Sequence, residues 1–314
     1  FESELALRRA AGNRGVEMAL VDLRDRGAVR RALGRVKPHV VLHAAAHKHV
    51  TFMERYPEEA IVNNVLATRD LIDACGEAGV ERFVMLSTDK AVNPRSVMGA
   101  SKRVAELLIG ERTAQGSPVR LMAVRFGNVL GSRGSVVPLF LHQIARGGPV
   151  TVSHPDTTRY FMTVKEAAML VLEAGALGTG GEIFILDMGE QLHILDLARE
   201  LITLSGLRPE ADIPIVISGL HAGEKLREEL LHDAEELVPT AVAKIGAARR
   251  RDGARPAVEA AIPELEALAR SADREGIARA LERLLPEARL RHDEEREGSP
   301  ARPAGRAPLP EGDR

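Results

Sequence analysis

The sequence predicts an α/β fold built on a doubly wound parallel sheet, and three observations support this prediction. Strand-like runs rich in Val, Ile, Leu and Met alternate with helix-like segments, a pattern typical of parallel strands joined by crossover helices. The run Arg82–Ser87 is apolar without alternation, as expected for a strand that is covered on both faces. With 314 residues, of which 45% are hydrophobic, the chain can bury a large core.

The first half of the chain supplies these elements in regular order. Proline suits the first turn of a helix, so a long helix is expected to begin near Pro57 and to turn Ile61, Val65, Leu71 and Ile72 inward. In chain order we expect a strand at 16–21 that ends in Asp22, a helix at 25–35, a strand at 40–43, the long helix, a strand at 82–87, a helix at 96–112 and a strand at 121–126.

Beyond Gly127 the expected elements become shorter and more mixed, which indicates a smaller α/β lobe added to the sheet. Gly127, Gly131, Gly134 and Pro138 punctuate the chain at this point. In the lobe we expect a helix at 135–145, an extended segment at 150–153, a helix at 164–174, an extended segment at 183–186, a helix at 194–204 and an extended segment at 213–217.

The C-terminal part of the chain divides into an ordered and a disordered piece. Apolar residues at helical spacing predict a final pair of helices, namely Leu265, Leu268, Ile277, Leu281 and Leu284. From residue 294 onward, charged residues and prolines without apolar periodicity predict a disordered tail.

Charge and cysteine content exclude several classes of protein. The 43 Lys and Arg residues nearly balance the 45 Asp and Glu residues, so the net charge of -2 gives no strong field for nucleic acid or an anionic membrane. The single cysteine, Cys75, excludes an internal disulfide framework and fits a reducing compartment. No apolar run approaches the roughly 18 residues of a membrane-spanning helix, and the first residues lack an export signal.

Three predicted strands end in chemically rich segments. These are H-A-A-A-H-K-H at 43–49, S-T-D-K at 87–90 and F-G-N-V-L-G-S-R-G-S at 126–135. Ligands of open parallel sheets bind beyond the carboxyl ends of the strands, so the site is expected where these segments meet. The small residues Ala44–Ala46 would let a flat ring or a ribose approach the backbone.

The first of these segments contains three histidines, which admit a metal site. No carboxylate stands at ligand spacing from His43, His47 or His49, so a structural or hydrogen-bonding role is favoured and no metal is expected. We interpret Lys48 as a positive charge near a phosphate or substrate.

The second segment places a hydroxyl, a carboxylate and an amine on consecutive residues. Thr88, Asp89 and Lys90 could together supply an anchor, a proton donor and a proton acceptor. For an isolated T-D-K the favoured reading is a helix-capping aspartate and a solvated lysine. The following helix favours chemistry instead, because Met98 and Lys102 are four residues apart, share one face, and enclose small residues that leave room for a bound molecule.

This order of motifs resembles the extended short-chain dehydrogenase/reductase superfamily of nucleotide-sugar enzymes. Most members carry Tyr-x-x-x-Lys where this chain has Met98 and Lys102. A methionine at that place is similar to the CapD-type polysaccharide-biosynthesis branch, the UDP-N-acetylglucosamine 4,6-dehydratases, and the resemblance covers roughly residues 1–230. The other segments that carry it are S-T-D-K-A-V-N-P, H-A-A-A-H-K-H-V, R-F-G-N-V-L-G-S-R-G-S-V, T-R-Y-F-M-T and G-E-K-L-x-E-E-L.

The resemblance implies a Rossmann-like domain that lacks its first βαβ portion, because the family's G-x-G-x-x-G turn has no counterpart in this chain. Large members carry an amino-terminal membrane region, so the expected setting is the cytoplasmic side, with a longer parent protein anchored in the bacterial inner membrane. The expected divisions are an incomplete NAD(P)-binding domain at 1–134, a substrate lobe at 135–245 with strand exchange between the two, a helical extension at 246–293 and a disordered tail at 294–314.

The resemblance also implies the catalytic roles. Thr88 would hold the C4 hydroxyl of the sugar, Asp89 would protonate the leaving C6 hydroxyl, and Lys90 would take the C5 proton. Met98 faces them in place of the usual phenol, and Lys102 would hydrogen-bond the ribose of a tightly held NAD or NADP. Because a lysine base must be neutral, burial against Met98 is expected to lower the pKa of Lys90.

Binding residues follow from the same resemblance. Arginine suits a diphosphate because its fork gives paired charge-assisted hydrogen bonds, although outside this motif order Arg133 and Arg159 would be read as solvated surface residues. The implied cofactor contacts are Asp22, Leu23, Ala44, Ala45, Lys102, Phe126 and Val129, and the implied contacts to a UDP-sugar are Lys48, Asn128, Arg133, Arg159 and Glu224.

Two alternatives remain open at this point. One is a UDP-sugar 4-epimerase or reductase on the same scaffold, which the missing tyrosine disfavours. The other is a non-catalytic UDP-sugar-binding fragment, which the missing glycine-rich turn favours. We further expect a homo-oligomer, with no nucleic-acid partner and no membrane contact from this part of the protein.

Overall fold

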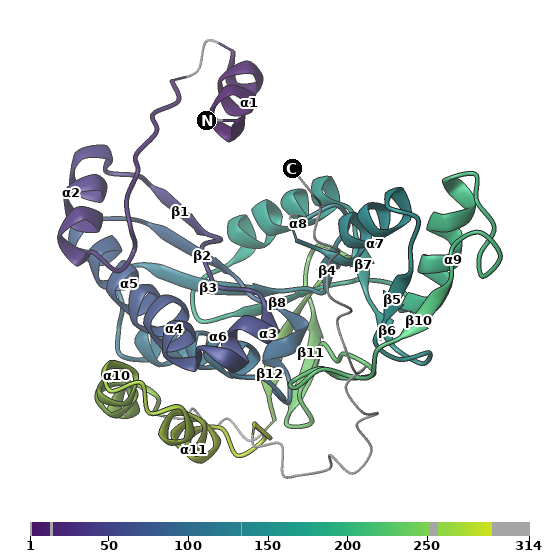
Figure 1. The fold of residues 1–314 in the computed structure, drawn as a ribbon. Coiled ribbons are helices and arrows are strands. Elements are labelled where there is room, and N and C mark those ends of the chain that lie inside the picture. The colour runs from purple at the N-terminus through teal and green to yellow at the C-terminus, as the bar shows by residue number, and fades with distance from the viewer. Residues whose placement is uncertain (1, 13–14, 133, 252–256, 291–314) are drawn as a thin grey trace, which may run out of the picture.

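A six-stranded sheet forms the centre of the described chain (Figure 1). The computed structural model describes residues 2–12, 15–132, 134–251 and 257–290. The first four strands of the sheet are parallel and the last two run antiparallel to their neighbours. In spatial order the strands are β1 (Val40–His43), β2 (Arg82–Leu86), β3 (Arg120–Arg125), β8 (Ile183–Leu186), β12 (Ile245–Arg250) and β11 (Glu235–Pro239).

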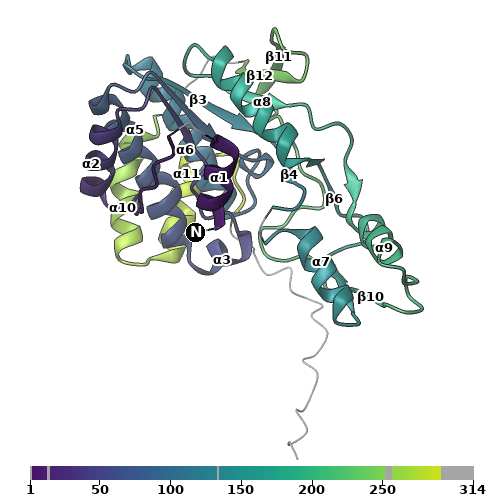
Figure 2. The same cartoon turned by 90° about the horizontal axis from the view of Figure 1, so that it is seen from above.

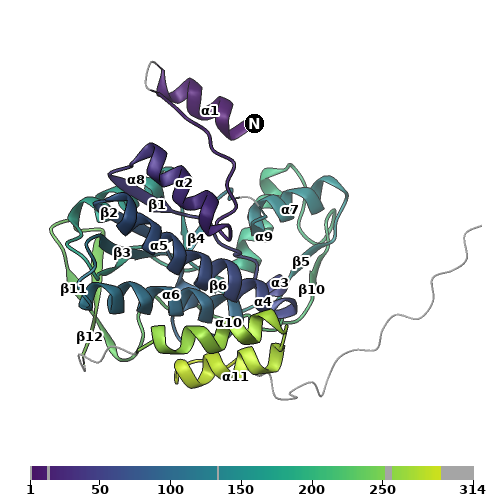
Figure 3. The same cartoon turned by 90° about the vertical axis from the view of Figure 1, so that its left-hand side faces the viewer.

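Helices cover both faces of this sheet. One face is covered by α8 (Val164–Leu177), which packs on β2, β3 and β8. The helices of the other face form two layers (Figure 3). The inner layer contains α2 (Arg26–Val36), α4 (Pro57–Ala60), the π-helical η1 (Ile61–Leu66), α5 (Ala67–Ala78) and α6 (Val97–Ala114), and the outer layer contains α10 (Ile262–Arg270) and α11 (Arg274–Leu284).

A smaller lobe lies to one side of the sheet (Figure 2). It has its own apolar core, in which Phe140, Ile144 and Ile202 are buried. Its elements are α7 (Val136–Ala145), α9 (Ile194–Leu204) and the parallel pair β5 (Val150–Val152) and β10 (Ile215–Ile217). Short pairs join the lobe to the sheet, namely β4 (Asn128–Val129) with β7 (Phe161–Met162) and β6 (Thr158–Arg159) with β9 (Leu192–His193).

The remaining elements are short or lie at the periphery. Figures 1 and 3 show α1 (Glu2–Ala11) standing apart from the rest of the fold. The others are α3 (Val50–Arg55) and the single 3₁₀ turns η2 (Asp89–Ala91) and η3 (Glu259–Ala261). None of the helices in the described ranges is both long and apolar enough to cross a bilayer.

The prediction of a doubly wound α/β fold is confirmed, but the strand expected at 16–21 is wrong. These residues follow an irregular, exposed path, and the side chain of Leu20 is fully exposed. The apolar residues alone could not make a strand, because a strand needs a neighbour for its backbone hydrogen bonds and this segment pairs with no described strand.

The antiparallel strands at the far edge of the sheet were not expected from the sequence. Residues 246–250, assigned above to a helical extension, continue β12, which pairs with β8 in the register Ile245 to Leu186. The Gly and Ala residues of this strand carry little apolar pattern, so tertiary pairing decides its conformation. The two helices expected next do form, as α10 and α11. The tail expected from residue 294 lies outside the described residues.

A buried network of charges joins the sheet to α6. The guanidinium of Arg125, at the end of β3, lies 2.7 Å from the Glu106 carboxylate and 2.9 Å from that of Glu235. Glu106 also accepts a 2.6 Å hydrogen bond from the Ser87 hydroxyl and contacts Arg103 at 3.1 Å. Burial would raise the pKa of Glu106, but the two guanidinium groups outweigh it and lower the pKa. The network therefore fixes the ends of β2 and β3 against α6.

We expect Arg125→Met to lower the free energy of unfolding by about 3–5 kcal/mol, because it leaves the buried carboxylates of Glu106 and Glu235 with one shared cation, Arg103, where the unsubstituted chain has two. Urea unfolding measures the effect. Arg208→Met is the control, since the Arg208 pair with Asp212 is solvent-exposed and worth at most about 1 kcal/mol. Equal losses in the two variants would contradict a structural role for the network.

Candidate active site

A cavity of about 900 Å³ opens at the carboxyl ends of β1, β2 and β3. The three strand-end segments identified in the sequence all contribute to its wall, as expected for a parallel sheet. Helix α8 closes it from the other side through Ala167 and Val171. Of the predicted site residues, those that line this cavity are Ala44, Lys48, Thr88, Lys90, Met98, Lys102, Phe126, Asn128 and Val129.

Thr88, Asp89 and Lys90 form a connected group at the end of β2. The Thr88 hydroxyl and the Lys90 amine both donate a hydrogen bond to Oδ1 of Asp89, and each donor lies 3.0 Å from this oxygen. Asp89 is fully buried, and its Oδ2 has no hydrogen-bond partner among the described residues. Thr88 and Lys90 line the cavity while Asp89 lies behind them, so the carboxylate can exchange protons with either neighbour.

The expected lowering of the Lys90 pKa is wrong. Burial would by itself lower the pKa of this amine, but the carboxylates of Asp89 and Glu228 outweigh burial, and the pKa is raised. The positive charge of Arg159 acts in the lowering direction. The S-T-D-K motif contains Asp89 but not Glu228. With one carboxylate acting against burial, the sequence could not predict that the pKa of Lys90 would be raised.

Helix α6 brings Met98 and Lys102 to the same cavity. Ser96 caps the helix by accepting a hydrogen bond from the Gly99 N–H. Met98 and Lys102 then follow one turn apart, 3% and 5% exposed. The Lys102 amine makes no hydrogen bond or ion pair within the described part of the chain, and burial lowers its pKa to about 8, with Glu106 opposing the shift. A buried amine is thus available to a bound molecule.

Gly99 sets the approach of α6 to the Lys90 loop. An ideal Cβ on this residue would lie 2.2 Å from the Lys90 carbonyl oxygen, so only glycine fits without moving the backbone that carries Lys90. A small residue between Met98 and Lys102 therefore lets α6 pack closely against the loop that carries Lys90, in addition to leaving room in the cavity.

The loop after β1 is held by Asn64 from the π-helical turn η1. The Asn64 side chain accepts from the His47 N–H at 2.8 Å and donates to the His47 carbonyl at 3.0 Å. It also donates to the Ser101 hydroxyl of α6. π-Helical turns are frequent at functional sites, and this one fixes the loop relative to Lys102.

His43 has the hydrogen-bonding role favoured by the sequence. Its ring lies 2.9 Å from the Thr68 hydroxyl and is 3% exposed. Burial, with the nearby Lys102 charge, lowers the His43 pKa to about 4, so the ring is neutral at physiological pH. No group of three or more potential metal ligands gathers within the described ranges.

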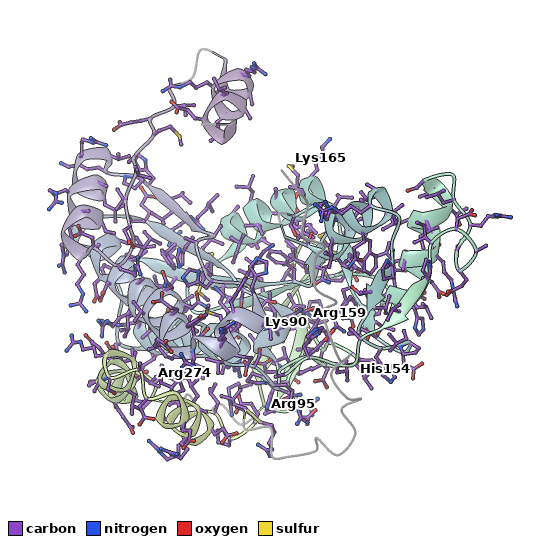
Figure 4. The ribbon with its side chains drawn as sticks, viewed as in Figure 1. Lys90, Arg95, His154, Arg159, Lys165 and Arg274 are labelled. Carbon is purple, nitrogen blue, oxygen red and sulfur yellow. The ribbon has the colours of Figure 1, made fainter. Side chains whose placement is uncertain are left out.

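A second cavity of about 270 Å³ adjoins the first, and Lys90 and Asn128 belong to both walls. Arg159 and Glu224 line it and contact each other at 3.1 Å. Arg159 is therefore a buried residue, not a solvated surface arginine. Figure 4 places Lys90 and Arg159 close to the centre of the molecule, between the sheet and the lobe.

Glu228 is a site residue that the sequence analysis missed. It is 3% exposed and lies 3.3 Å from the Lys90 amine and 4.0 Å from the Arg159 side chain. It belongs to the quoted G-E-K-L-x-E-E-L segment, but nothing in that segment distinguishes it from the next residue, Glu229, whose side chain is half exposed. Only its three-dimensional position identifies it.

Several predicted contacts lie outside the two cavities. Asp22 is exposed and ion-paired with Arg24, which lowers its pKa to about 2. Leu23 packs against the main core, and Ala45 is exposed and does not line either cavity. Arg133 lies outside the described residues.

We expect Gly99→Ala to lower the free energy of unfolding by about 1–3 kcal/mol, because its methyl group would displace the Lys90 backbone. Gly110→Ala, farther along the same helix where no heavy atom would contact the new Cβ, should raise the free energy by about 0.5–1 kcal/mol. Urea unfolding compares both variants with the unsubstituted chain. Two stabilised variants would contradict the close contact.

Lys102→Met should change the pH dependence of stability. The native state loses the Lys102 proton at about pH 8, against 10.5 as the usual value, so the protonated amine costs stability below pH 8 and ceases to do so as the pH rises toward 10.5. The stability advantage of the methionine variant should therefore shrink by about 3 kcal/mol over this interval.

Urea unfolding at several pH values measures this advantage. Lys244→Met, which removes an exposed amine paired with Glu166, is the control. A difference between Lys102→Met and the unsubstituted chain that stays constant with pH would contradict the lowered pKa of Lys102.

Comparison of this chain with known proteins identifies its family. Polysaccharide biosynthesis proteins match residues 3–250. The capsular polysaccharide biosynthesis protein CapD of Staphylococcus aureus is 54% identical over 231 residues, which are 73% of this chain and 38% of CapD. The chain thus spans well under half of that relative.

Other relatives carry names that describe enzymes. The UDP-N-acetylglucosamine 4,6-dehydratase (inverting) of Campylobacter jejuni is 37% identical, over 67% of this chain and 60% of that protein. A UDP-glucose 4-epimerase of Rickettsia rickettsii is 36% identical, over 73% of this chain and 66% of that protein. Among solved structures, Pen from Bacillus thuringiensis superposes with a TM-score of 0.70 at 32% identity, covering 81% of this chain and 78% of Pen. The chain therefore belongs to the polysaccharide biosynthesis protein family.

Proposed function

We propose that this chain carries the active site of a nucleotide-sugar 4,6-dehydratase that acts on UDP-N-acetylglucosamine or a close UDP-N-acetylhexosamine. The connected group of Thr88, Asp89 and Lys90, which faces Met98 in one cavity, is the observation that carries the proposal. The named dehydratase among the relatives supports it. A product of this kind would serve capsule or O-antigen synthesis, in keeping with CapD.

The large cavity fits part of a nicotinamide cofactor. Lys102 offers a buried amine without a partner in the described chain, and the small side chain of Ala44 leaves the backbone accessible. Phe126 and Val129 add apolar surface. Bound NAD(P) would accept a hydride from C4 of the sugar and return one to C6. Lys102 would hold the ribose, and its charge would act beside the reacting carbon.

The remaining chemistry is proton transfer by this chain's own residues. The proton of the C4 hydroxyl can pass to Asp89 through the Thr88 hydroxyl, which already donates a hydrogen bond to this carboxylate. The resulting carboxylic acid on Asp89 lies behind Thr88, so its proton would reach the C6 hydroxyl, which leaves as water, through the Thr88 hydroxyl. Neutral Lys90 takes the C5 proton, made acidic by the C4 ketone, and later returns a proton to C5. Each group thereby regains the form in which it began.

This cycle needs Lys90 without its proton at the start. The two neighbouring carboxylates favour the ammonium form, so turnover should increase with pH as Lys90 deprotonates. The smaller cavity, with Arg159, Asn128 and Glu224, would bind the UDP part of the substrate. In this assignment residues 1–134 hold the cofactor and the reacting groups, and residues 135–245 supply Arg159 and Glu224 to the UDP part of the substrate.

Lys90→Ala should reduce dehydration of UDP-N-acetylglucosamine by about 10²-fold or more, because it removes the base that takes the C5 proton. Mass spectrometry of the reaction with the full-length protein measures loss of one water. Lys165→Ala, which removes an exposed lysine of α8, should leave the rate unchanged.

Other outcomes separate the alternatives. An isomeric sugar of unchanged mass would identify an epimerase. Unchanged substrate, together with calorimetric binding of UDP but not of NAD, would identify a non-catalytic binding module. Dehydration that survives in Lys90→Ala would refute the role given to this residue.

A further inference from the structure

Glu228 enters the site from a loop that is itself fixed. Its backbone carbonyl accepts a 2.7 Å hydrogen bond from the Gln191 side chain. Its carboxylate lies between two cations, 3.3 Å from the Lys90 amine and 4.0 Å from the Arg159 Nε. The side chain is 2% exposed, so solvent screens these contacts little.

Charged groups surround the Lys90 amine on several sides. Asp89 faces it from η2 at 3.0 Å, Glu228 faces it from the loop before β11 at 3.3 Å, and Arg159 acts on it from β6. Two carboxylates thus oppose one guanidinium and the cost of burial. Of the two, Asp89 would be occupied by the proposed proton transfers, whereas Glu228 has no assigned part in them.

The carboxylates also share an unusual feature. Oδ2 of Asp89 and Oε2 of Glu228 are both buried and have no hydrogen-bond partner among the residues that the structure describes. An unpaired buried acceptor costs about 1–3 kcal/mol. Glu228 lines the smaller cavity and contacts the Lys90 amine, which lines both cavities. This position favours a role of the Glu228 charge in holding the Lys90 amine.

We propose that Glu228 is a positioning residue that holds the Lys90 ammonium at the junction of the two cavities and sets the pH at which Lys90 can accept a proton. The catalytic meaning of this inference rests on the proposed function, but the electrostatic coupling does not. Removal of the Glu228 charge should leave Asp89 as the single carboxylate in contact with Lys90, so that burial and Arg159 count for more.

Nuclear magnetic resonance of lysine side chains tests the coupling without any assay of activity. Protein labelled at lysine Cε and Nζ gives one signal for each of seven residues, and Lys90→Arg identifies the Lys90 signal. The seven are Lys37, Lys48, Lys90, Lys102, Lys165, Lys225 and Lys244. In Glu228→Gln the titration midpoint of Lys90 should fall by about one pH unit or more.

Two further variants make the test specific. Glu229→Gln removes the adjacent carboxylate, which contacts Lys225 and Asn93, and should leave the Lys90 midpoint unchanged. Glu228→Asp keeps the charge, so it should keep the midpoint closer to that of the unsubstituted protein than glutamine does. An unchanged midpoint in folded Glu228→Gln, or equal shifts in Glu228→Gln and Glu229→Gln, would overturn the inference.

A pH profile of the full-length protein adds the catalytic readout. If the proposed function holds, the rising limb of the dehydration rate should move to lower pH in Glu228→Gln by the same interval as the Lys90 signal. A shifted signal in a protein that dehydrates no UDP-sugar would support the coupling and refute the proposed function. A shifted rate profile with an unshifted signal would refute the coupling alone.

Discussion

The fixed distance between the ends of β2 and β3 and the helix α6 is the constraint on which the site depends. Glu106 maintains it, because its carboxylate accepts hydrogen bonds from Ser87, Arg103 and Arg125. Ser87 directly precedes Thr88, and Glu106 lies one turn beyond Lys102 on α6. A buried carboxylate bonded to two cations tolerates little displacement, since each lost contact would leave an unpaired charge in the interior. The segment that carries Thr88, Asp89 and Lys90 and the helix that carries Lys102 are thus positioned by the same carboxylate.

Lys90 links two cavities that differ in chemistry. The larger is walled mainly by small and apolar side chains, together with the amine of Lys102. The smaller contains Arg159, Glu224 and Glu228 and is suited to polar groups. A ligand that extends from one cavity into the other would therefore pass the amine of Lys90. In the proposed function, the sugar joins the nucleotide at this place, so that one residue would contact both parts of the substrate.

The sequence predicted what local pattern and parallel topology determine. Strand ends of a parallel sheet must meet at one edge, so the convergence of the segments after β1, β2 and β3 could be foreseen. The four-residue spacing of Met98 and Lys102 likewise determines a shared helix face. Long-range effects could not be foreseen in the same way. Glu228, which acts together with Asp89 to raise the pKa of Lys90, is 138 residues away along the chain. The segment at 16–21 has strand-like composition but pairs with no described strand.

The outer layer formed by α10 and α11 shows that the region of family similarity and the folding unit have different ends. The matched region stops at residue 250, yet Ile262, Leu265, Ile277 and Leu281 are each at most 1% exposed and pack into the same apolar core as α5 and α6. A polypeptide cut at residue 250 would expose the apolar surface that these two helices cover. Such a piece would be prone to self-association, although every residue of the proposed chemistry would still be present.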